Sequence, residues 1–352
     1  KSDRRRIAWA MDLLDVADLA RPTMLDRVNF GGDWAWLAED QDRVHKLLNL
    51  ALDEGLVFMP FSGSVYDDTT CYYDYGSGIQ IIEVQGDDLV LRGVAPQVGE
   101  ARRALLHDDT LFGISDNAVQ AFDLGDLDAP ARLDRLDVAR NVSAIKVLGN
   151  DLLRFGQDWW TDEVSLDLVP LAAAESAESA AMLDLSSLVD VRDRTCNETD
   201  GSYRYNYTYF TGQVFVHGDH AFVPREVYEY GYEGGGSDYY NRETMRITVV
   251  ALTGEGAPRV VGELALEPTG YDSAREVTSY YAGFVQTERA LLVGRRTGYY
   301  SYDSATGERS ETSFAYDVID LSAGADARVV SRLEVPDNLA WGGWGYGAYG
   351  CM

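Results

Sequence analysis

The sequence predicts an all-β fold, and within that class a β-propeller, with six blades as the first choice. Two observations carry this prediction. One hairpin pattern occurs four times without a gap, and neighbouring units are spaced like four-stranded blades, with anchor residues Glu83, Asp123 and Asp167 about 40 residues apart. A double sandwich does not predict such a repeat. Seven blades remain the alternative, because the closing blade lacks an obvious second strand.

The recurring pattern is a strand, a short turn and a second strand. Each copy ends an apolar strand, turns through small residues that often include Pro, and then alternates apolar and polar side chains for about six residues. That period of two is typical of a strand with one buried face. The four copies are Asp15–Phe30, Asp123–Val138, Ala251–Leu266 and Asp320–Val335.

Alternation and turn residues place the expected strands in five successive units. The first two units comprise residues 44–52, 56–61, 79–84, 88–94, 101–106, 110–114, 118–124 and 132–138. The third comprises residues 142–148, 151–155, 163–169 and 181–185. The last two comprise residues 213–217, 220–224, 245–252, 259–266, 282–286, 290–295, 313–321 and 328–335.

The two chain ends are expected to share the closing blade. A propeller closes by pairing strands from both ends, which removes an exposed sheet edge. Residues 7–30 supply an outer strand pair and residues 339–349 an inner strand, which gives six blades. We therefore expect a single propeller domain over residues 1–352, as a fragment of a longer chain. Insertions are expected at residues 64–78, 172–181, 193–211, 228–243 and 297–312.

The composition limits the classes of partner. The formal net charge is −28, and only Lys1, Lys46 and Lys146 are lysines. Phosphate backbones and anionic membranes bind clustered basic residues, so no nucleic acid is expected as a partner. No apolar run approaches the roughly 18 residues of a transmembrane segment, and no signal peptide is visible. An acidic, lysine-poor chain suits an extracellular or high-salt setting, and equally a GC-rich genome.

The hairpin units also carry a family resemblance. They follow V-x-G-x-x-L-x-V and then D-L-x-D-x-x-x-P-x-x-L-x-x-L-x-V, as in Asp123–Val138. This pattern resembles bacterial secreted β-propeller-domain proteins with LVIVD-like repeats, and the resemblance covers most of the chain. It implies a propeller in an extracytoplasmic location, either secreted, periplasmic or at the cell surface, and it implies no particular activity. WD and kelch repeats are less similar, because their signature pairs are missing.

Three stretches rich in Tyr, Gly and Asp join the second and third strands of their units, at residues 64–78, 228–240 and 297–307. Equivalent connections of a propeller emerge on one face, and loops held by rigid strands concentrate functional residues. Tyr is enriched at interfaces, although it is also a good strand former and long loops are also tolerated insertions. The predicted ligand-binding residues are Tyr66, Asp67, Asp68, Tyr72, Tyr73, Asp74, Tyr75, Tyr228, Tyr230, Tyr232, Asp238, Tyr239, Tyr240, Tyr299, Tyr300, Tyr302 and Asp303.

Metal sites have two weak candidates. Asp67, Asp68 and Asp74 supply oxygen ligands of the kind that Ca²⁺ prefers, but the EF-hand loop pattern is absent. His217 and His220 flank a Gly-Asp turn, which places two imidazoles on neighbouring strands where they could share a metal. Solvated loop acids and turn-flanking histidines are the alternatives. Ca²⁺ is thus the one cofactor considered.

Three cysteines, Cys71, Cys196 and Cys351, form no CxxC motif. In an oxidising compartment they allow one disulfide and one unpaired thiol, and their spacing does not select the pair.

Catalytic motifs are missing. The sequence contains no Gly-x-Ser-x-Gly elbow, no HExxH and no Gly-rich phosphate loop before a helix. We expect a non-enzymatic propeller that acts as an interaction or structural module, with glycan or other proteins of a cell-surface or extracellular assembly as partners. One alternative is a secreted glycan hydrolase or lyase with carboxylates in the central channel. Another is a Ca²⁺-dependent adhesion module.

Overall fold

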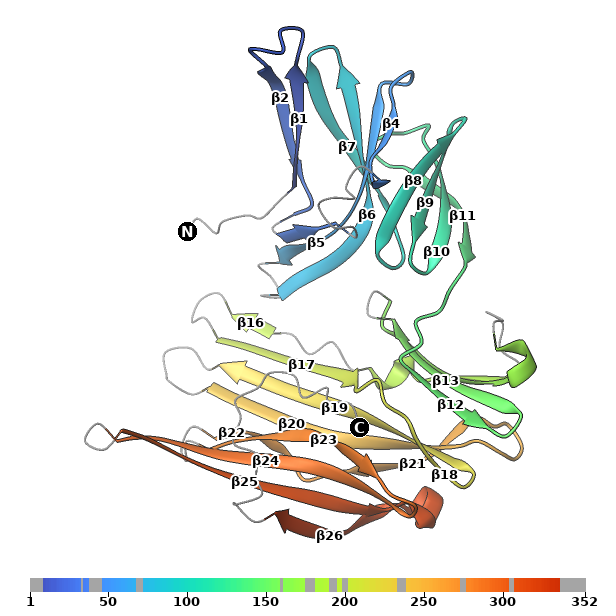
Figure 1. Cartoon of the computed structure of the whole chain (residues 1–352), viewed down its shortest axis with the longest axis vertical. Helices are drawn as coiled ribbons and strands as arrows, with labels where there is room; N and C mark the ends of the chain where they lie inside the picture. Colours follow the sequence, from blue (N-terminus) through green and yellow to red (C-terminus); the bar gives the residue numbers. More distant parts are fainter. Residues whose placement is uncertain are drawn as a thin grey trace. The chain divides into compact units, whose positions relative to one another are not determined.

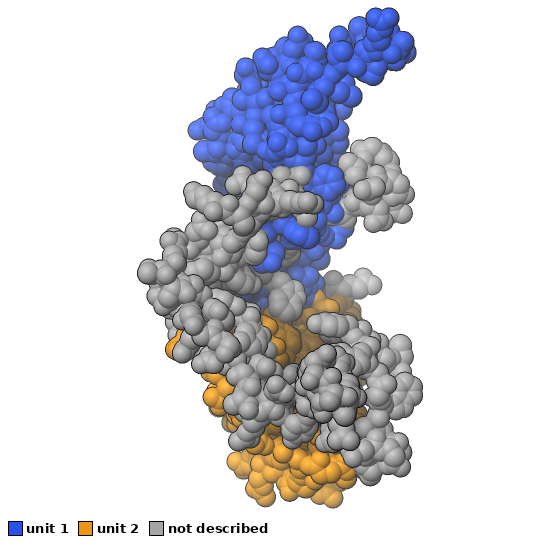
Figure 2. All heavy atoms as spheres, turned by 90° about the vertical axis from the view of Figure 1, so that its left-hand side faces the viewer, with its two compact units in different colours: residues 1–141, 158–163, 175–178 blue, residues 142–157, 164–174, 179–352 orange. Residues whose placement is uncertain are grey.

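A computed structural model describes residues 9–32, 34–37, 46–67, 72–158, 161–174, 181–189, 195–197, 202–232, 239–272, 277–303 and 307–335. The fold is all-β, with antiparallel strand pairs and short 3-10 turns among these residues (Figure 1). The chain divides into two compact units (Figure 2): unit 1 comprises residues 1–141, 158–163 and 175–178, and unit 2 the rest. No described helix is long and apolar enough to cross a bilayer.

Unit 1 holds three sheets that follow the order of the chain. β1 pairs with β2, then β3 and β4 both pair with β5 of the β5–β6–β7 sheet, and β8 to β11 pair in sequence. The strands are β1 Trp9–Asp15, β2 Thr23–Phe30, β3 Trp34–Trp36, β4 Asn49–Ala51, β5 Leu56–Asp67, β6 Tyr72–Gln85, β7 Asp88–Pro96, β8 Ala101–His107, β9 Thr110–Ser115, β10 Ala118–Asp123 and β11 Ala131–Asp137.

The sheets of unit 1 pack face to face. Successive side chains of a strand point to opposite faces, so the middle sheet contributes to two cores. Ile81 on one face packs in a cluster with Leu111 and Phe122 of the β8–β11 sheet. Ile82 on the other face packs in a cluster with Phe30 of β2. Burial of such side chains stabilises each by about 1.5–3 kcal/mol, which ties each sheet to the next.

Unit 2 contains a four-stranded and an eleven-stranded sheet. The four-stranded sheet consists of β12 Ala144–Leu148, β13 Asp151–Asp158, β14 Glu163–Pro170 and β15 Ala181–Asp184. The larger sheet consists of β16 Thr195–Asn197, β17 Ser202–Phe210, β18 Phe215–His217, β19 His220–Tyr232, β20 Tyr239–Ala251, β21 Arg259–Ala265, β22 Thr269–Asp272, β23 Val277–Gln286, β24 Ala290–Asp303, β25 Gly307–Asp320 and β26 Arg328–Val335.

The same packing recurs in unit 2, where β19 and β20 supply two cores. Val223 lies in one cluster with Phe155 of β13 and Leu166 of β14. Its neighbour Phe222 lies in a second cluster with Leu291 of β24, on the opposite face. The β18–β21 part of the large sheet therefore lies between β12–β15 and β23–β26.

The predicted hairpin repeat is confirmed, and the copies share a bulge. In each copy the register shifts immediately before the anchor residue of the pattern, a feature that increases local twist. The shifts lie at Leu13/Leu14, Ala121/Phe122, Val249/Val250 and Val318/Ile319. The β6–β7 pair has the equivalent shift at Gln80/Ile82, just before Glu83.

The anchor aspartate explains why this position recurs in the pattern. Asp123 accepts a 2.9 Å hydrogen bond from Gly125 N, which closes an Asx turn at the end of β10. Asp15 and Asp320 make the equivalent bonds, of 2.8 and 2.9 Å, to the amides two residues further on. Ala251 holds the same place in the third copy and has no such carboxylate.

Several strand predictions need correction. The first strand expected at 44–52 is described only as β4, and residues 41–45 lie outside the described part. The expected insertion at 193–211 contains β16 and β17, because its alternating tyrosines find a partner in β19. In the insertion at 172–181, a 3-10 turn covers Leu171–Ala173 and residues 175–180 are outside the described part. β3 and β22 were not expected.

Candidate functional site

The stretches predicted as long loops are the distal parts of paired strands, so that prediction was wrong. β5–β6, β19–β20 and β24–β25 continue as hairpins far beyond the four-stranded units. Tyr66 lies opposite Tyr73 in the first hairpin, and Tyr230 lies opposite Asn241 in the second. Tyr at alternating positions favours a strand over a loop, because aromatic side chains pack well on a pleated surface.

The predicted binding residues are thus distributed over five strands, with Tyr66 and Asp67 on β5, Tyr72, Tyr73, Asp74 and Tyr75 on β6, Tyr228, Tyr230 and Tyr232 on β19, Tyr239 and Tyr240 on β20, and Tyr299, Tyr300, Tyr302 and Asp303 on β24. Asp68 and Asp238 lie outside the described residues. The first hairpin belongs to unit 1 and the other two to unit 2, so their gathering on one face stays a prediction.

Tyr75 is the candidate of unit 1 whose side chain is described. It is 59% exposed, and its ring lies 6.4 Å from that of Trp36, measured between centroids. Trp36 in turn donates a 3.1 Å hydrogen bond from Nε1 to Glu100 Oε1. One face of an amphipathic ring is therefore supported by the protein while the rest of the side chain meets solvent, as at many recognition surfaces.

In unit 2 the distal halves of β19 and β20 connect two of the predicted four-stranded blades into one sheet (Figure 1). β20 pairs with β21 over residues 246–251 and with β22 over residues 241–243. β22 also pairs with β23, the first strand of the next unit. β19 likewise pairs with β18 over residues 220–222 and with β17 over residues 225–232. The elongated hairpin β19–β20 is therefore flanked by strands on both sides.

A layer of tyrosines covers one face of this sheet. Tyr207 on β17 lies opposite Tyr228 on β19, and the rings stack with centroids 4.8 Å apart. Tyr207 also stacks on Tyr209 at 6.0 Å. Residues directly opposite in a ladder share a face, so Glu226, opposite Tyr209, and Glu243, opposite Tyr228, lie on this face as well.

Glu226 and Glu243, which we call the carboxyl pair, are the most perturbed acids of the site. Burial raises the pKa of Glu226 to about 7, against the hydrogen bond from Tyr209, and the charge of Glu243 raises it further. Burial also raises the pKa of Glu243, which is 8% exposed and is hydrogen-bonded by Tyr228 and Thr269. Glu226 is therefore half protonated near neutral pH, a state suited to proton transfer.

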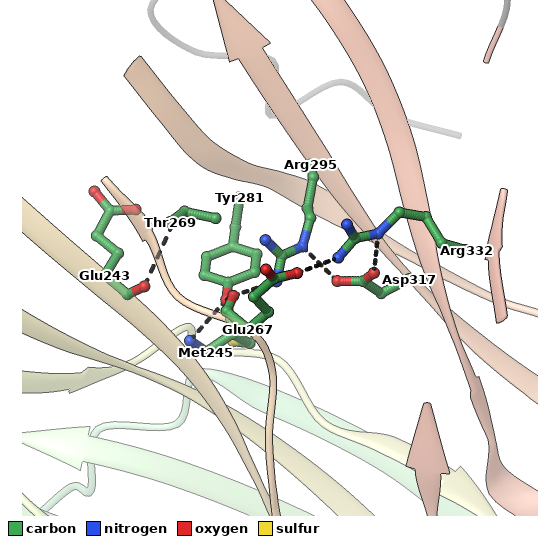
Figure 3. Close-up of polar contacts among 8 residues, drawn as sticks. All are labelled: Glu243, Met245, Glu267, Thr269, Tyr281, Arg295, Asp317 and Arg332. Atoms are coloured by element: carbon green, nitrogen blue, oxygen red, sulfur yellow. Dashed lines mark hydrogen bonds and ion pairs between the residues drawn. The ribbon is translucent and has the colours of Figure 1, made fainter. Parts of the chain in front are cut away.

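On strands β24, β25 and β26 of the same sheet, which pack against β19–β20, a salt-bridge network lies beside this layer (Figure 3). Asp317, 2% exposed, accepts from Arg295 Nε and, at 2.8 Å, from Arg332 Nε. Arg332 Nη2 also donates to Glu267 Oε2 at 2.9 Å. The Arg295 guanidinium lies 5.2 Å from the ring centroid of Tyr281, within cation–π range. Both arginines are thus paired within their own sheet.

Tyr281 links the network to the carboxyl-pair strand. Its hydroxyl accepts a 3.1 Å hydrogen bond from Met245 N on β20 and donates one of 2.9 Å to Glu267 O (Figure 3). Burial raises the pKa of Tyr281 to about 12, so the hydroxyl stays neutral. Tyr281 on β23 therefore contacts β20 near the point where β20 changes its neighbouring strand.

The opposite face of β19–β20 carries a separate ion-pair cluster. Arg225 and Arg246 both donate to Glu263 of β21, the second at 2.5 Å. Burial lowers the pKa of Arg225, although the Glu263 charge opposes that effect. Arg225 is one residue from Glu226 along β19, and Arg246 is three residues from Glu243 along β20. Because side chains alternate between faces along a strand, these arginines point away from the carboxyl pair.

Of the two metal candidates, the Asp67, Asp68 and Asp74 set depends on side chains outside the described part of the chain, so it stays a prediction. His217 and His220 are directly opposite in the β18–β19 pair, as predicted, but the His220 ring packs beside Gly324. No group of three or more His, Cys, Asp or Glu suited to a metal occurs among the described residues. Cys196 lies on β16, whereas Cys71 and Cys351 are outside the described part, so the disulfide prediction stays a prediction.

Sequence reasoning missed the carboxyl pair, Tyr207, Tyr209 and the Arg295 network. The sequence did contain a signal for part of it, since residues 226–232 read EVYEYGY. In a strand, Glu226, Tyr228, Tyr230 and Tyr232 share one face. Interpreting this stretch as a loop hid the pattern. The Arg295–Asp317 contact gave no local signal, because it depends on the β24–β25 register.

Comparison with known proteins adds little. No protein-family model matches the sequence, and no curated protein matches it. Among solved structures, the chain is similar to hydrazine synthase of Kuenenia stuttgartiensis, at 7% identity and a TM-score of 0.19, covering 72% of this chain and 76% of that one. It is also similar to Hsv2 of Kluyveromyces lactis, at 7% identity and a TM-score of 0.17, covering 76% and 97%. Backbone overlap this low supports no conclusion about this chain.

Proposed function

We propose that this chain is a non-enzymatic β-propeller of the bacterial secreted, LVIVD-like kind, and that it works outside the cytoplasm as an interaction module. In this proposal it has six blades, and the N- and C-terminal segments share the closing blade. The partner is a protein of a cell-surface or extracellular assembly. The tyrosine-bearing distal halves of the three elongated hairpins form the binding surface.

The propeller proposal is supported by contacts between the first strands of consecutive predicted blades. In unit 1, Asn49 of β4 donates a 2.8 Å hydrogen bond from Nδ2 to Ala104 O of β8. In unit 2, Gln286 of β23 donates one of 2.7 Å from Nε2 to Val216 O of β18. First strands of propeller blades lie around a common axis while the sheets face each other. Both contacts fit that arrangement.

The observation that carries the binding proposal is the pairing of the tyrosine-rich segments. Paired strands fix the backbone before a partner arrives, so binding costs less ordering entropy than it would for a loop. Tyr adds a large amphipathic contact with few rotatable bonds. Tyr75, which has support from Trp36 and is exposed, is the described example.

A protein suits this surface better than a glycan. A sugar ring stacks on a free aromatic face, but Tyr207 already has Tyr209 and Tyr228 stacked on it. Extended hairpins with alternating side chains instead resemble the strand surfaces that bind peptide segments. The net charge of −28 favours a partner with a basic surface.

The test uses an envelope fraction from the source organism and the labelled full chain. We expect saturable binding that is lost after protease treatment of the fraction and kept after periodate oxidation of its glycans. Loss with periodate alone would identify a glycan partner. Tyr75→Ala should weaken binding, whereas Tyr280→Ala, a change at an exposed tyrosine outside the three hairpin tips, should not. If the chain shows no saturable binding even to the untreated envelope fraction, the proposal is contradicted.

The carboxyl pair favours one second candidate, a glycan hydrolase. Two neighbouring carboxyl groups, one with a pKa of about 7, match the acid and base of such enzymes. Polysaccharide substrates incubated with the full chain would then release reducing ends, and Glu226→Gln would abolish the release. We place this second because Glu243 is buried, whereas a polysaccharide needs access to both carboxyl groups.

A further inference from the structure

The carboxyl pair lies at the junction between a four-stranded unit and its distal extension. Along β20, Glu243 is the last residue paired with β22, and Arg246 is the first paired with β21. The short connection between β21 and β22 contains Glu267, which Tyr281 and Arg295 hold through its carbonyl oxygen. Any loss of contact at Glu226 or Glu243 therefore acts on the base of the tyrosine-bearing hairpin.

The described hydrogen-bond donors to the carboxyl pair are neutral. Tyr209 donates to Glu226, and Tyr228 and Thr269 bond Glu243. Glu226 and Glu243 are diagonal neighbours on adjacent strands, with Cβ atoms about 7 Å apart in such a ladder. Two buried negative charges without a cation are costly, so the folded arrangement prefers at least one bound proton.

Among the described residues, the groups that face the pair do not supply a free positive charge to it. The described ionisable groups that face it are Tyr207 and Tyr209 on β17, Tyr228 on β19, Tyr281 on β23, and the network of Arg295, Asp317, Arg332 and Glu267 on or beside strands β24–β26. Burial raises the pKa of Tyr209 and of Tyr281, so both stay neutral. Arg295 and Arg332 are engaged by Asp317 and Glu267.

We propose that the carboxyl pair is a proton-controlled switch that fixes the distal half of the β19–β20 hairpin when protonated and loosens it when both carboxyls ionise. The hairpin bears Tyr228, Tyr230 and Tyr232, so the switch regulates the binding surface. That consequence for binding rests on the proposed function, whereas the opening of the hairpin does not.

The direction follows from proton linkage. A carboxyl whose pKa is raised by folding binds more protons in the closed hairpin than in the open one, so closure weakens as pH rises. The effect begins above the ordinary pKa of 4.5 and is complete once pH passes about 7 for Glu226. Between these limits the closing equilibrium changes by up to about tenfold for each pH unit.

The experiment is hydrogen–deuterium exchange on the full chain without any partner, from about pH 5 to about pH 8, with rates corrected for the intrinsic pH dependence. Protection of peptides covering residues 225–232 and 239–245 should fall by up to about tenfold per pH unit. Peptides of β8–β10 in unit 1 should keep constant protection. Equal pH dependence in both regions would overturn the proposal.

Two isosteric substitutions, made singly and together, locate the effect. In Glu226→Gln, Glu243→Gln and the double variant, the amide mimics the protonated carboxyl, so protection should stay high at about pH 8. Glu229→Gln is the matched control, on the same strand but the opposite face, and it should behave like the wild type. Unchanged pH dependence in the double variant would overturn the switch. Because no partner is present, these outcomes are independent of whether the binding proposal holds.

Discussion

Tyr207 and Tyr228 stack across the β17–β19 ladder with their ring centroids 4.8 Å apart. This contact joins two stretches that sequence patterns assign to separate connections. It also places Glu226 and Glu243 beside aromatic rings, in a layer where Glu243 is buried and Glu226 is partly buried. The stability of that layer, and its response to protons, is therefore the property that mutations of the site should change.

Removing the Tyr209 hydroxyl should lower the stability of unit 2 and raise the pKa of Glu226. Tyr209→Phe deletes the donor to Glu226, so we expect a loss of about 1 kcal/mol in the free energy of unfolding of unit 2. The lost donor stabilised the ionised carboxylate, so the pKa of Glu226 should rise above about 7. Urea unfolding measures the first quantity, and infrared spectroscopy of the carboxyl band across pH measures the second. A lowered pKa would contradict this account.

Breaking the buried network should be more costly. Asp317→Asn leaves Arg295 and Arg332 without their shared carboxylate at a side chain that is 2% exposed. We expect a loss of about 3–5 kcal/mol, because an uncompensated buried charge remains. Thermal and urea unfolding of the full chain provide the measurement. Asp326→Asn, at an exposed position, is the control and should change stability by less than about 0.5 kcal/mol.

A matched pair of glycines tests the β5–β6 hairpin. Gly63 and Gly76 are directly opposite, but a Cβ on Gly63 would overlap Gly31 O and lie 3.0 Å from Trp34 O, whereas a Cβ on Gly76 meets nothing within 4 Å. Gly63→Ala should therefore destabilise unit 1 by about 1–3 kcal/mol, and Gly76→Ala should be neutral or slightly stabilising. Equal effects of the two changes in urea unfolding would show that the register is different.

Local sequence patterns predicted much of the fold. Period-two alternation located β8–β11 and β26 to within about two residues, since these strands follow clear turns, whereas it missed the first six residues of β25. The recurring Asp123 position reflects an Asx turn, a purely local interaction. Such features depend on neighbours in the chain, so the sequence contains them directly.

The site was harder to predict, because its contacts depend on register between distant strands. Tyr and Gly mark loops and strands alike, so Tyr228 and Tyr230 fitted either interpretation. The pairing of β17 with β19 decides between them, through packing that no short pattern encodes. Likewise, nothing near Glu243 in sequence distinguishes it from the other 57 acidic residues, and the alternating tyrosines after Glu226 indicate a shared face only once this stretch is taken as a strand.

The central claim is that the distal hairpin halves bind the partner. The register allows each half to be replaced by an Asn-Gly turn that keeps its base, joining Ser64 to Tyr75, Glu229 to Arg242 and Gly298 to Thr312. The direct measurement is the dissociation constant of this shortened chain for the envelope fraction, compared with that of the intact chain. We predict at least tenfold weaker binding, about 1.4 kcal/mol, with unit 2 still folded. An unchanged dissociation constant would contradict the claim.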